Sequence, residues 1–108
     1  IKWLDENLNL PDWDNVNKHA LAFFLDGSAG KNGTKIPDND FFVIYNAGNT
    51  GIRQKIPAPP EKKAWFLAIN TFLKGTKSIP PKGEETPVNG GVILTKPRSS
   101  IVLLTKLI

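Results

Sequence analysis

Few residues of this 108-residue sequence have the types and spacing that catalysis or metal binding requires. His19 is the single histidine, and there is no cysteine, so neither a Cys–His pair nor a disulfide nor a thiolate metal site can form. No serine stands in the Gly-x-Ser-x-Gly pattern of an exposed nucleophile. We interpret His19 as a structural residue at the edge of a strand, and we expect no cofactor.

The carboxylates give no catalytic or metal-binding pattern either. Asp12 and Asp14 could bind Ca²⁺, but the twelve-residue loop with its glycine and final glutamate is missing, so loop capping is favoured. Glu84 and Glu85 are adjacent, whereas acid/base work on a sugar needs two carboxylates facing each other across the bond. The sequence therefore predicts no catalytic residue and no metal site.

Two short motifs in the segment after residue 26 are rejected. Residues 27–32 (GSAGKN) faintly resemble a phosphate-binding loop, but the glycines are too close and Asn32 replaces the Ser or Thr that would hold Mg²⁺. Residues 32–34 (NGT) form an N-glycosylation sequon, which we attribute to chance because nothing indicates secretion.

Three tryptophans, Trp3, Trp13 and Trp65, are the candidate carbohydrate-binding residues. An exposed indole can stack on the apolar face of a pyranose ring, and it can also anchor a protein interface. The alternative is that these side chains fill the core or close a sheet edge. That alternative applies least to Trp13, which lies in a polar segment.

The elements that must position these residues are predicted to be strands, and residues 41–46 (FFVIYN) form the principal one. Phe41, Val43 and Tyr45 share one face, and Phe42 and Ile44 share the other. Because both faces are apolar, we expect a central strand that is covered on both sides. Further strands are expected at residues 1–4, 20–25, 52–56, 64–71, 91–95 and 100–107.

The connections between these strands fit an all-β fold. Residues 57–60 (PAPP) end one strand because proline lacks the backbone donor of a sheet ladder, and residues 74–90 are expected to form a long polar loop. With about seven short strands and no convincing helix, the sequence predicts a two-sheet antiparallel β-sandwich, with residues 1–108 as a single domain.

Apolar side chains are more numerous than one sandwich core requires. We expect part of this surplus to pack against something outside the chain. The candidates are Leu21, Phe23, Phe42, Ile44 and Phe66. Because the sequence contains no methionine, we also expect it to be a piece cut from a longer protein.

The charge is uneven along the chain, whose total is +4. Residues 1–45 hold four lysines against seven acids (−3), and residues 46–108 hold ten bases against three acids (+7). A basic half could bind nucleic acid, but no aromatic-interleaved basic motif appears, so a solvated surface is favoured and no nucleic acid partner is expected. No apolar run is long enough to span a membrane, and a reducing, cytoplasmic setting is expected.

Taken in order, several stretches resemble the C-terminal part of isoamylase-type glycogen debranching enzymes, members of the α-amylase superfamily (glycoside hydrolase family 13). The passage that leaves their catalytic barrel resembles residues 1–6 (IKWLDE), 12–13 (DW) and 20–27 (ALAFFLDG). Their following strands and closing segment resemble residues 40–47 (DFFVIYNA), 56–57 (IP), Trp65 and 97–104 (PRSSIVLL).

This resemblance implies a non-catalytic C-terminal sandwich that packs on the (β/α)₈ barrel of its parent chain and stabilises it. The nucleophilic Asp and the acid Glu of the barrel have no counterpart here, so no catalytic role carries over. The parent would cleave α-1,6-glucosidic bonds, with isoamylase, pullulanase and other α-glucan activities left open. A carbohydrate-binding module that contacts α-glucan through an exposed Trp is the alternative.

Overall fold

The computed structural model describes residues 1–14, 19–27, 39–60, 62–73, 78–81, 83–88 and 90–107. Residues 28–32 of the segment that resembles a phosphate-binding loop and the sequon at residues 32–34 lie outside these ranges. No helix long and apolar enough to cross a membrane occurs in the described ranges.

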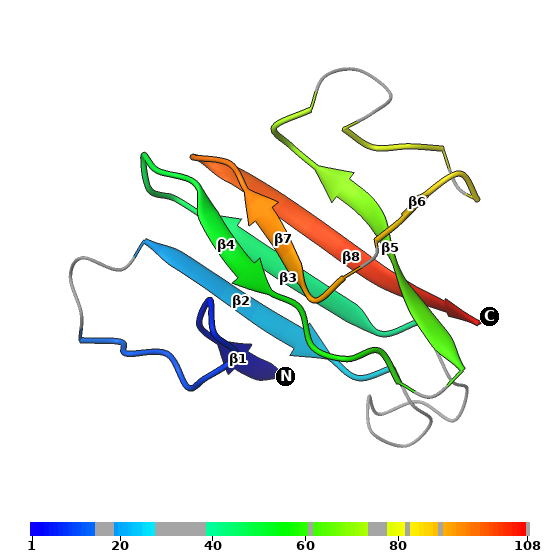
Figure 1. Ribbon diagram of the computed structural model, residues 1–108, viewed down its shortest axis with the longest axis horizontal. Helices are drawn as coiled ribbons and strands as arrows, with labels where there is room; N and C mark the ends of the chain where they lie inside the picture. Colours follow the sequence, from blue (N-terminus) through cyan, green and yellow to red (C-terminus); the bar gives the residue numbers. More distant parts are fainter. Residues whose placement is uncertain are drawn as a thin grey trace.

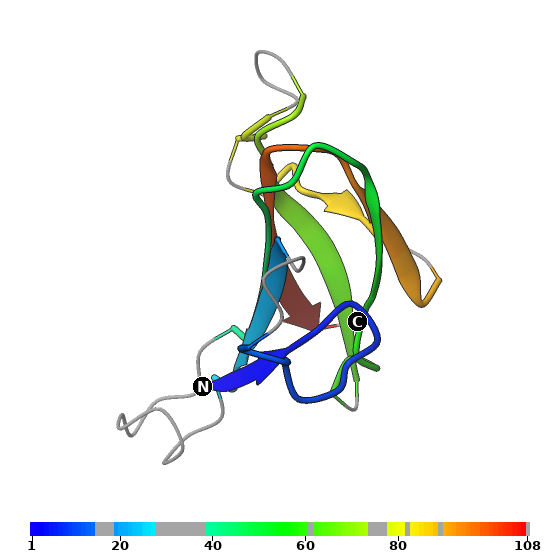
Figure 2. The ribbon, with the colours of Figure 1, turned by 90° about the vertical axis from the view of Figure 1, so that its left-hand side faces the viewer.

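Eight strands make up the regular structure of the described residues (Figure 1). In chain order they are β1 (Lys2–Leu4), β2 (Ala20–Leu25), β3 (Phe41–Asn46), β4 (Ile52–Lys55), β5 (Lys63–Asn70), β6 (Thr86–Pro87), β7 (Val92–Thr95) and β8 (Ser99–Leu107). Six of them form a large antiparallel sheet in the order β1-β2-β3-β8-β5-β6, and β4 and β7 form a small antiparallel sheet. The small sheet covers one face of the large one (Figure 2), which confirms the predicted all-β sandwich.

β3 and β8 are neighbours in the middle of the large sheet, and each carries apolar side chains on both faces. β3 lies between β2 and β8, which confirms its predicted central position. Its Phe42 and Ile44 are fully buried between the two sheets. Its opposite face is covered only in part, since Val43 is buried but Tyr45 is 45% exposed.

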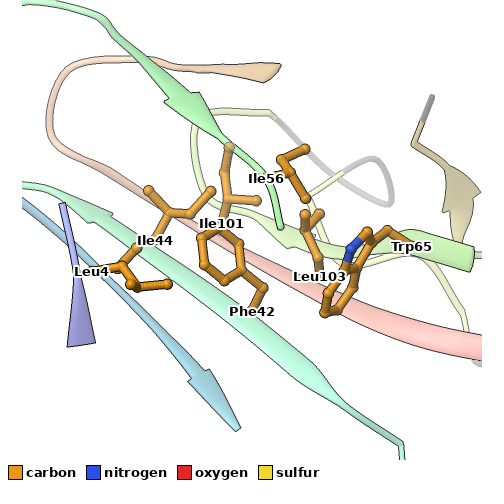
Figure 3. Close-up of a cluster of buried hydrophobic side chains, with 8 residues drawn as sticks. Leu4, Phe42, Ile44, Ile56, Trp65, Ile101 and Leu103 are labelled. Carbon is orange, nitrogen blue, oxygen red and sulfur yellow. The ribbon is translucent and has the colours of Figure 1, made fainter. Parts of the chain in front are cut away.

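The core fills the space between the two sheets. Its members are the buried side chains Leu4, Ala22, Phe42, Ile44, Ile56, Trp65, Ile101 and Leu103. Figure 3 shows Ile56, which follows β4, beside the residues that project from the large sheet. Phe42 and Ile44 therefore do not belong to the apolar surplus, because the small sheet already covers them.

One strand was not predicted from the sequence. β6 contains only Thr86 and Pro87, in the segment expected to be a polar loop, and it pairs with Leu67 and Phe66 of β5. A two-residue edge strand leaves no hydrophobic pattern to detect, and proline is tolerated there because an edge strand needs no second set of hydrogen bonds.

A β-bulge in β5 changes the predicted side-chain directions. Alternation places Trp65, Leu67 and Ile69 on one face, but the pairing register shifts between Leu67 and Ile69. Leu67 lies opposite the buried Leu103, whereas Ile69 lies opposite Val102 on the other face of the sheet. The extra residue in a bulge has this effect on every side chain that follows it.

A buried carboxylate ties the ends of four strands together. Asp40, just before β3, is fully buried. Its Oδ1 accepts the N–H of Gly27 at 2.8 Å, and its Oδ2 accepts Lys63 Nζ at 3.0 Å and the Thr105 hydroxyl at 3.1 Å. Since a buried polar group is tolerated only when it is hydrogen-bonded, these contacts allow the carboxyl group to lie between the strand ends.

Candidate functional site

The face of the large sheet that points away from the small sheet is apolar, and we call it the outer face. Among the described elements, no strand lies over it (Figure 2). Paired residues of antiparallel strands share a face, so the register defines rows across it. Two rows are apolar from end to end: Trp3–Phe23–Val43–Val102–Ile69 and Leu25–Phe41–Leu104–Phe66–Pro87.

Such rows are unusual on a solvated sheet, which normally carries polar side chains on its wet face. Apart from Val43 and the exposed Trp3 and Pro87, the members of these rows are half-buried. Phe23 and Phe66, two of the predicted surplus residues, both lie in these rows. The outer face therefore has the character of an interaction surface.

Four aromatic rings contact one another in series over β1, β2 and β3. Trp13 meets Trp3 edge to face at 6.0 Å between centroids, Trp3 lies 5.0 Å from Phe23, and Phe23 lies 6.0 Å from Tyr45. The interplanar angle of 74° shows that Trp3 and Trp13 are not coplanar. Trp13 is 67% exposed, so it presents most of its ring to solvent.

Trp65 occupies a different place from the other two tryptophans. It is 4% exposed and packs against Phe24 and Phe42 in the core. Its indole N–H donates to the Pro57 carbonyl at 2.8 Å, which satisfies the polar end of the ring. In this structure Trp65 offers no ring face to a sugar, and the carbohydrate-binding prediction rests on Trp3 and Trp13.

A cavity of about 410 Å³ lies where β2 begins and β3 ends. Its volume falls in the range of roughly 300–1,000 Å³ that is typical of small-molecule sites. Aromatic, acidic, imidazole and aliphatic side chains line it, among them Asp5, Asp12, Trp13, His19, Leu21 and Tyr45. The two aromatic residues are the two ends of the series of ring contacts.

Two further hollows share lining residues with this cavity. One of about 280 Å³ shares His19 with it, one of about 340 Å³ shares Tyr45 with it, and Arg98 lines both of the smaller hollows. Ala47 lines all three. We call the three together the end groove.

Backbone contacts fix the middle of the end groove. The N–H of Ala47 donates to the His19 carbonyl at 2.8 Å, and the N–H of Arg98 donates to the Gly48 carbonyl at 3.1 Å. A Cβ added to Gly48 would lie 3.2 Å from the Cβ of His19 and 3.3 Å from Asn46 Oδ1. Glycine at position 48 therefore allows His19 to lie against the turn.

Trp13 is the one described lining residue of the end groove that the sequence predicted to bind a ligand. His19, interpreted as structural, is exposed and lines two of the three hollows. For Tyr45 the sequence predicted only a place on one face of its strand. Because side chains alternate along a strand, Tyr45 points to the face opposite that of the buried Ile44. Arg98 has a φ of 50°, in the left-handed region, which no sequence pattern indicated.

Of the remaining sequence candidates, Asp12 lines the end groove, whereas Asp14, Glu84 and Glu85 do not. No group of three or more potential metal-ligating side chains occurs in the part of the chain that the structure describes. Asp12 accepts the N–H of Asp14 at 3.2 Å, as expected for loop capping. Glu85 forms an ion pair with Lys106 on β8, and the hydrogen bond from Lys106 lowers the pKa of this carboxyl.

Comparison with known proteins gives a consistent result. Residues 1–104 match the family model described as "Isoamylase, C-terminal". The chain is 30% identical over 95 residues to isoamylase 3, chloroplastic, of Oryza sativa subsp. japonica, an alignment that covers 87% of this chain and 11% of the relative. It is 22% identical over 73 residues to isoamylase 2, chloroplastic, of the same organism, covering 68% of this chain and 9% of the relative. The chain thus spans about a tenth of the length of these relatives.

Proposed function

The chain belongs to the isoamylase C-terminal family, and from this premise we propose that it is the non-catalytic C-terminal domain of an isoamylase-type α-glucan debranching enzyme. Its role is to pack on the catalytic (β/α)₈ barrel of the same polypeptide and to stabilise it. Hydrolysis of α-1,6-glucosidic bonds belongs to the barrel, which supplies both carboxylates of the retaining mechanism.

One observation carries this proposal: two complete rows of apolar residues cross the outer face. Each row spans five strands of the large sheet without a polar member. Covering such a surface removes apolar area from water and stabilises the assembly by about 25 cal/mol for each Å² buried. The small sheet already covers the opposite face, so the outer face is the one available for docking.

The docking surface can be tested in the full-length enzyme with one matched pair of variants. Leu104 is central in an apolar row of the outer face, while Leu94 is 50% exposed on β7 of the small sheet. We expect Leu104→Gln to destabilise the full-length enzyme by roughly 1.5–3 kcal/mol, the value of burying a leucine side chain. Leu94→Gln should change the stability little, because Leu94 stays in contact with water.

The measurement is the melting temperature of both variants, in the full-length enzyme and in the 108-residue chain. Docking through the outer face predicts that Leu104→Gln lowers the melting temperature more in the full-length enzyme than in the isolated chain. Equal effects in the two contexts would mean that the outer face does not contact the barrel.

A further inference from the structure

We propose that the end groove is a binding site for a linear α-glucan chain, separate from the apolar rows that dock on the barrel. The class of sugar rests on the proposed function, since the parent enzyme would act on α-glucan. The existence of a site for a neutral, hydroxyl-rich chain rests on the geometry of the end groove itself.

The aromatic residues of the groove are held in place before any ligand arrives. Trp13 and Tyr45 line the largest hollow, and the rings of Trp3 and Phe23 connect them through contacts of 5.0–6.0 Å between centroids. Trp13 is 67% exposed and Tyr45 is 45% exposed, so both rings have surface left for a pyranose. A pre-positioned side chain loses little conformational entropy on binding.

The polar groups of the groove suit hydroxyl groups better than they suit a charged ligand. Asp5 and Asp12 lie at one end, Arg98 lies at the other, and His19 lies between them. Carboxylates accept hydrogen bonds from sugar hydroxyls, a guanidinium donates to them, and an imidazole can do either. A polyanion would meet the two carboxylates, so a neutral ligand is favoured over nucleic acid.

The shape of the groove fits a chain rather than a single sugar. Three hollows of about 410, 280 and 340 Å³ all have Ala47 in their lining, and their other lining residues come from the start of β2, the end of β3 and the start of β8. Arg98 and Ser100 extend the lining beyond Tyr45. An oligosaccharide could therefore place successive rings from Trp13 toward Arg98.

No residue that lines the end groove belongs to the two apolar rows, although Trp3 and Phe23 of one row contact the groove residues Trp13 and Tyr45. The other row is farther from the groove. Leu104 and Phe66 lie in the apolar row toward the end of β2, whereas the end groove lies where β2 begins. Their functions can therefore be separated by mutation.

The test uses the full-length enzyme in native gels with and without glycogen, where binding retards migration. Trp13→Ala and His19→Ala each remove an exposed side chain that lines the groove. We expect Trp13→Ala to weaken glycogen binding about tenfold and His19→Ala to weaken it severalfold, with melting temperatures unchanged. Phe72→Ala is the control, because Phe72 is 51% exposed and lies outside the groove.

Reduced retardation of both groove variants at the wild-type melting temperature supports the proposal. Wild-type retardation of either variant overturns it. Retardation that falls only together with the melting temperature also overturns it, because Trp13 would then act in folding or docking. Failure of the docking proposal looks different: Leu104→Gln would then leave the full-length enzyme no more destabilised than the isolated chain, whatever the glycogen gels show.

Discussion

At the scale of single residues, Lys106 is a charged side chain that lies against one of the apolar rows of the outer face. It lies on the outer face of β8 with its Nζ 4.9 Å from the centroid of the Phe66 ring, and it forms an ion pair with Glu85. Glu85 also accepts the N–H of Gly83 at 3.0 Å. Together these contacts attach the segment before β6 to β8, across β5.

The ion pair predicts a pH-dependent contribution to stability. Lys106 lowers the pKa of Glu85 below its ordinary value of 4.5 in the folded state. The contribution is therefore fully present above about pH 4.5, and it is lost as the pH falls through the lower folded-state pKa. We expect Glu85→Gln to be less stable than the wild type near pH 7, with the two converging in acid.

The urea midpoint of unfolding, measured between about pH 3 and pH 7, checks this prediction. The difference should be small, because the pair lies near the surface and salt screens it. Glu84→Gln is the control, since the neighbouring Glu84 is exposed. A gap between wild type and Glu85→Gln that widens in acid would contradict the assignment.

At the scale of elements, the end of β3 is the place where the large and small sheets are joined. Asn46 is 3% exposed there. Its Nδ2 donates to the carbonyls of Thr50, Thr95 and Lys96 at 2.9–3.2 Å, and its Oδ1 accepts the N–H of Gly48 at 3.0 Å. One amide thus fixes the turn that leads to β4 and the end of β7.

We expect Asn46→Ala to destabilise the isolated chain by roughly 1–3 kcal/mol, because it removes the hydrogen bonds that this buried amide makes to the Thr50 and Thr95 carbonyls and to the Gly48 N–H. Chemical denaturation gives the free energy of unfolding directly. Asn49→Ala is the matched control, since Asn49 is exposed in the same turn. A similar loss in both variants would show that the turn sequence matters and the buried amide does not.

At the scale of the whole molecule, the two sheets of the sandwich differ in size. A six-stranded sheet is covered by a two-stranded one on one face, and the other face carries the apolar rows. An isolated chain with such a face exposes apolar area to water.

The isolated 108-residue chain is therefore expected to self-associate through the outer face as its concentration rises. Sedimentation equilibrium would show a reversible dimer, and Leu104→Gln should weaken it by introducing a polar amide into an apolar contact. Leu94→Gln should leave it unchanged. A chain that stays monomeric near millimolar concentration would show that the outer face does not drive self-association.

Much of this architecture follows from local sequence patterns. The bounds of β2 and β3 are as predicted, because runs such as residues 20–25 and 41–46 end in turn-forming residues. The two-faced apolar pattern also predicted that some side chains would be left for an outside partner, and Phe23 and Phe66 do lie on the outer face. Family membership was evident from the order of several stretches and is confirmed by the family match.

Tertiary structure decided which apolar residues are core and which are surface. Phe42 and Phe41 are adjacent and chemically identical, and only the position of the small sheet makes Phe42 fully buried. The bulge in β5 moved Ile69 to the outer face against its sequence alternation. The end groove joins Trp13 and His19, which are close in sequence, to Tyr45 and Arg98 from distant parts of the chain, so no local pattern could reveal it. Sequence thus determined the strands and the surplus of apolar side chains, while strand order and register determined where that surplus lies, because those depend on long-range pairing.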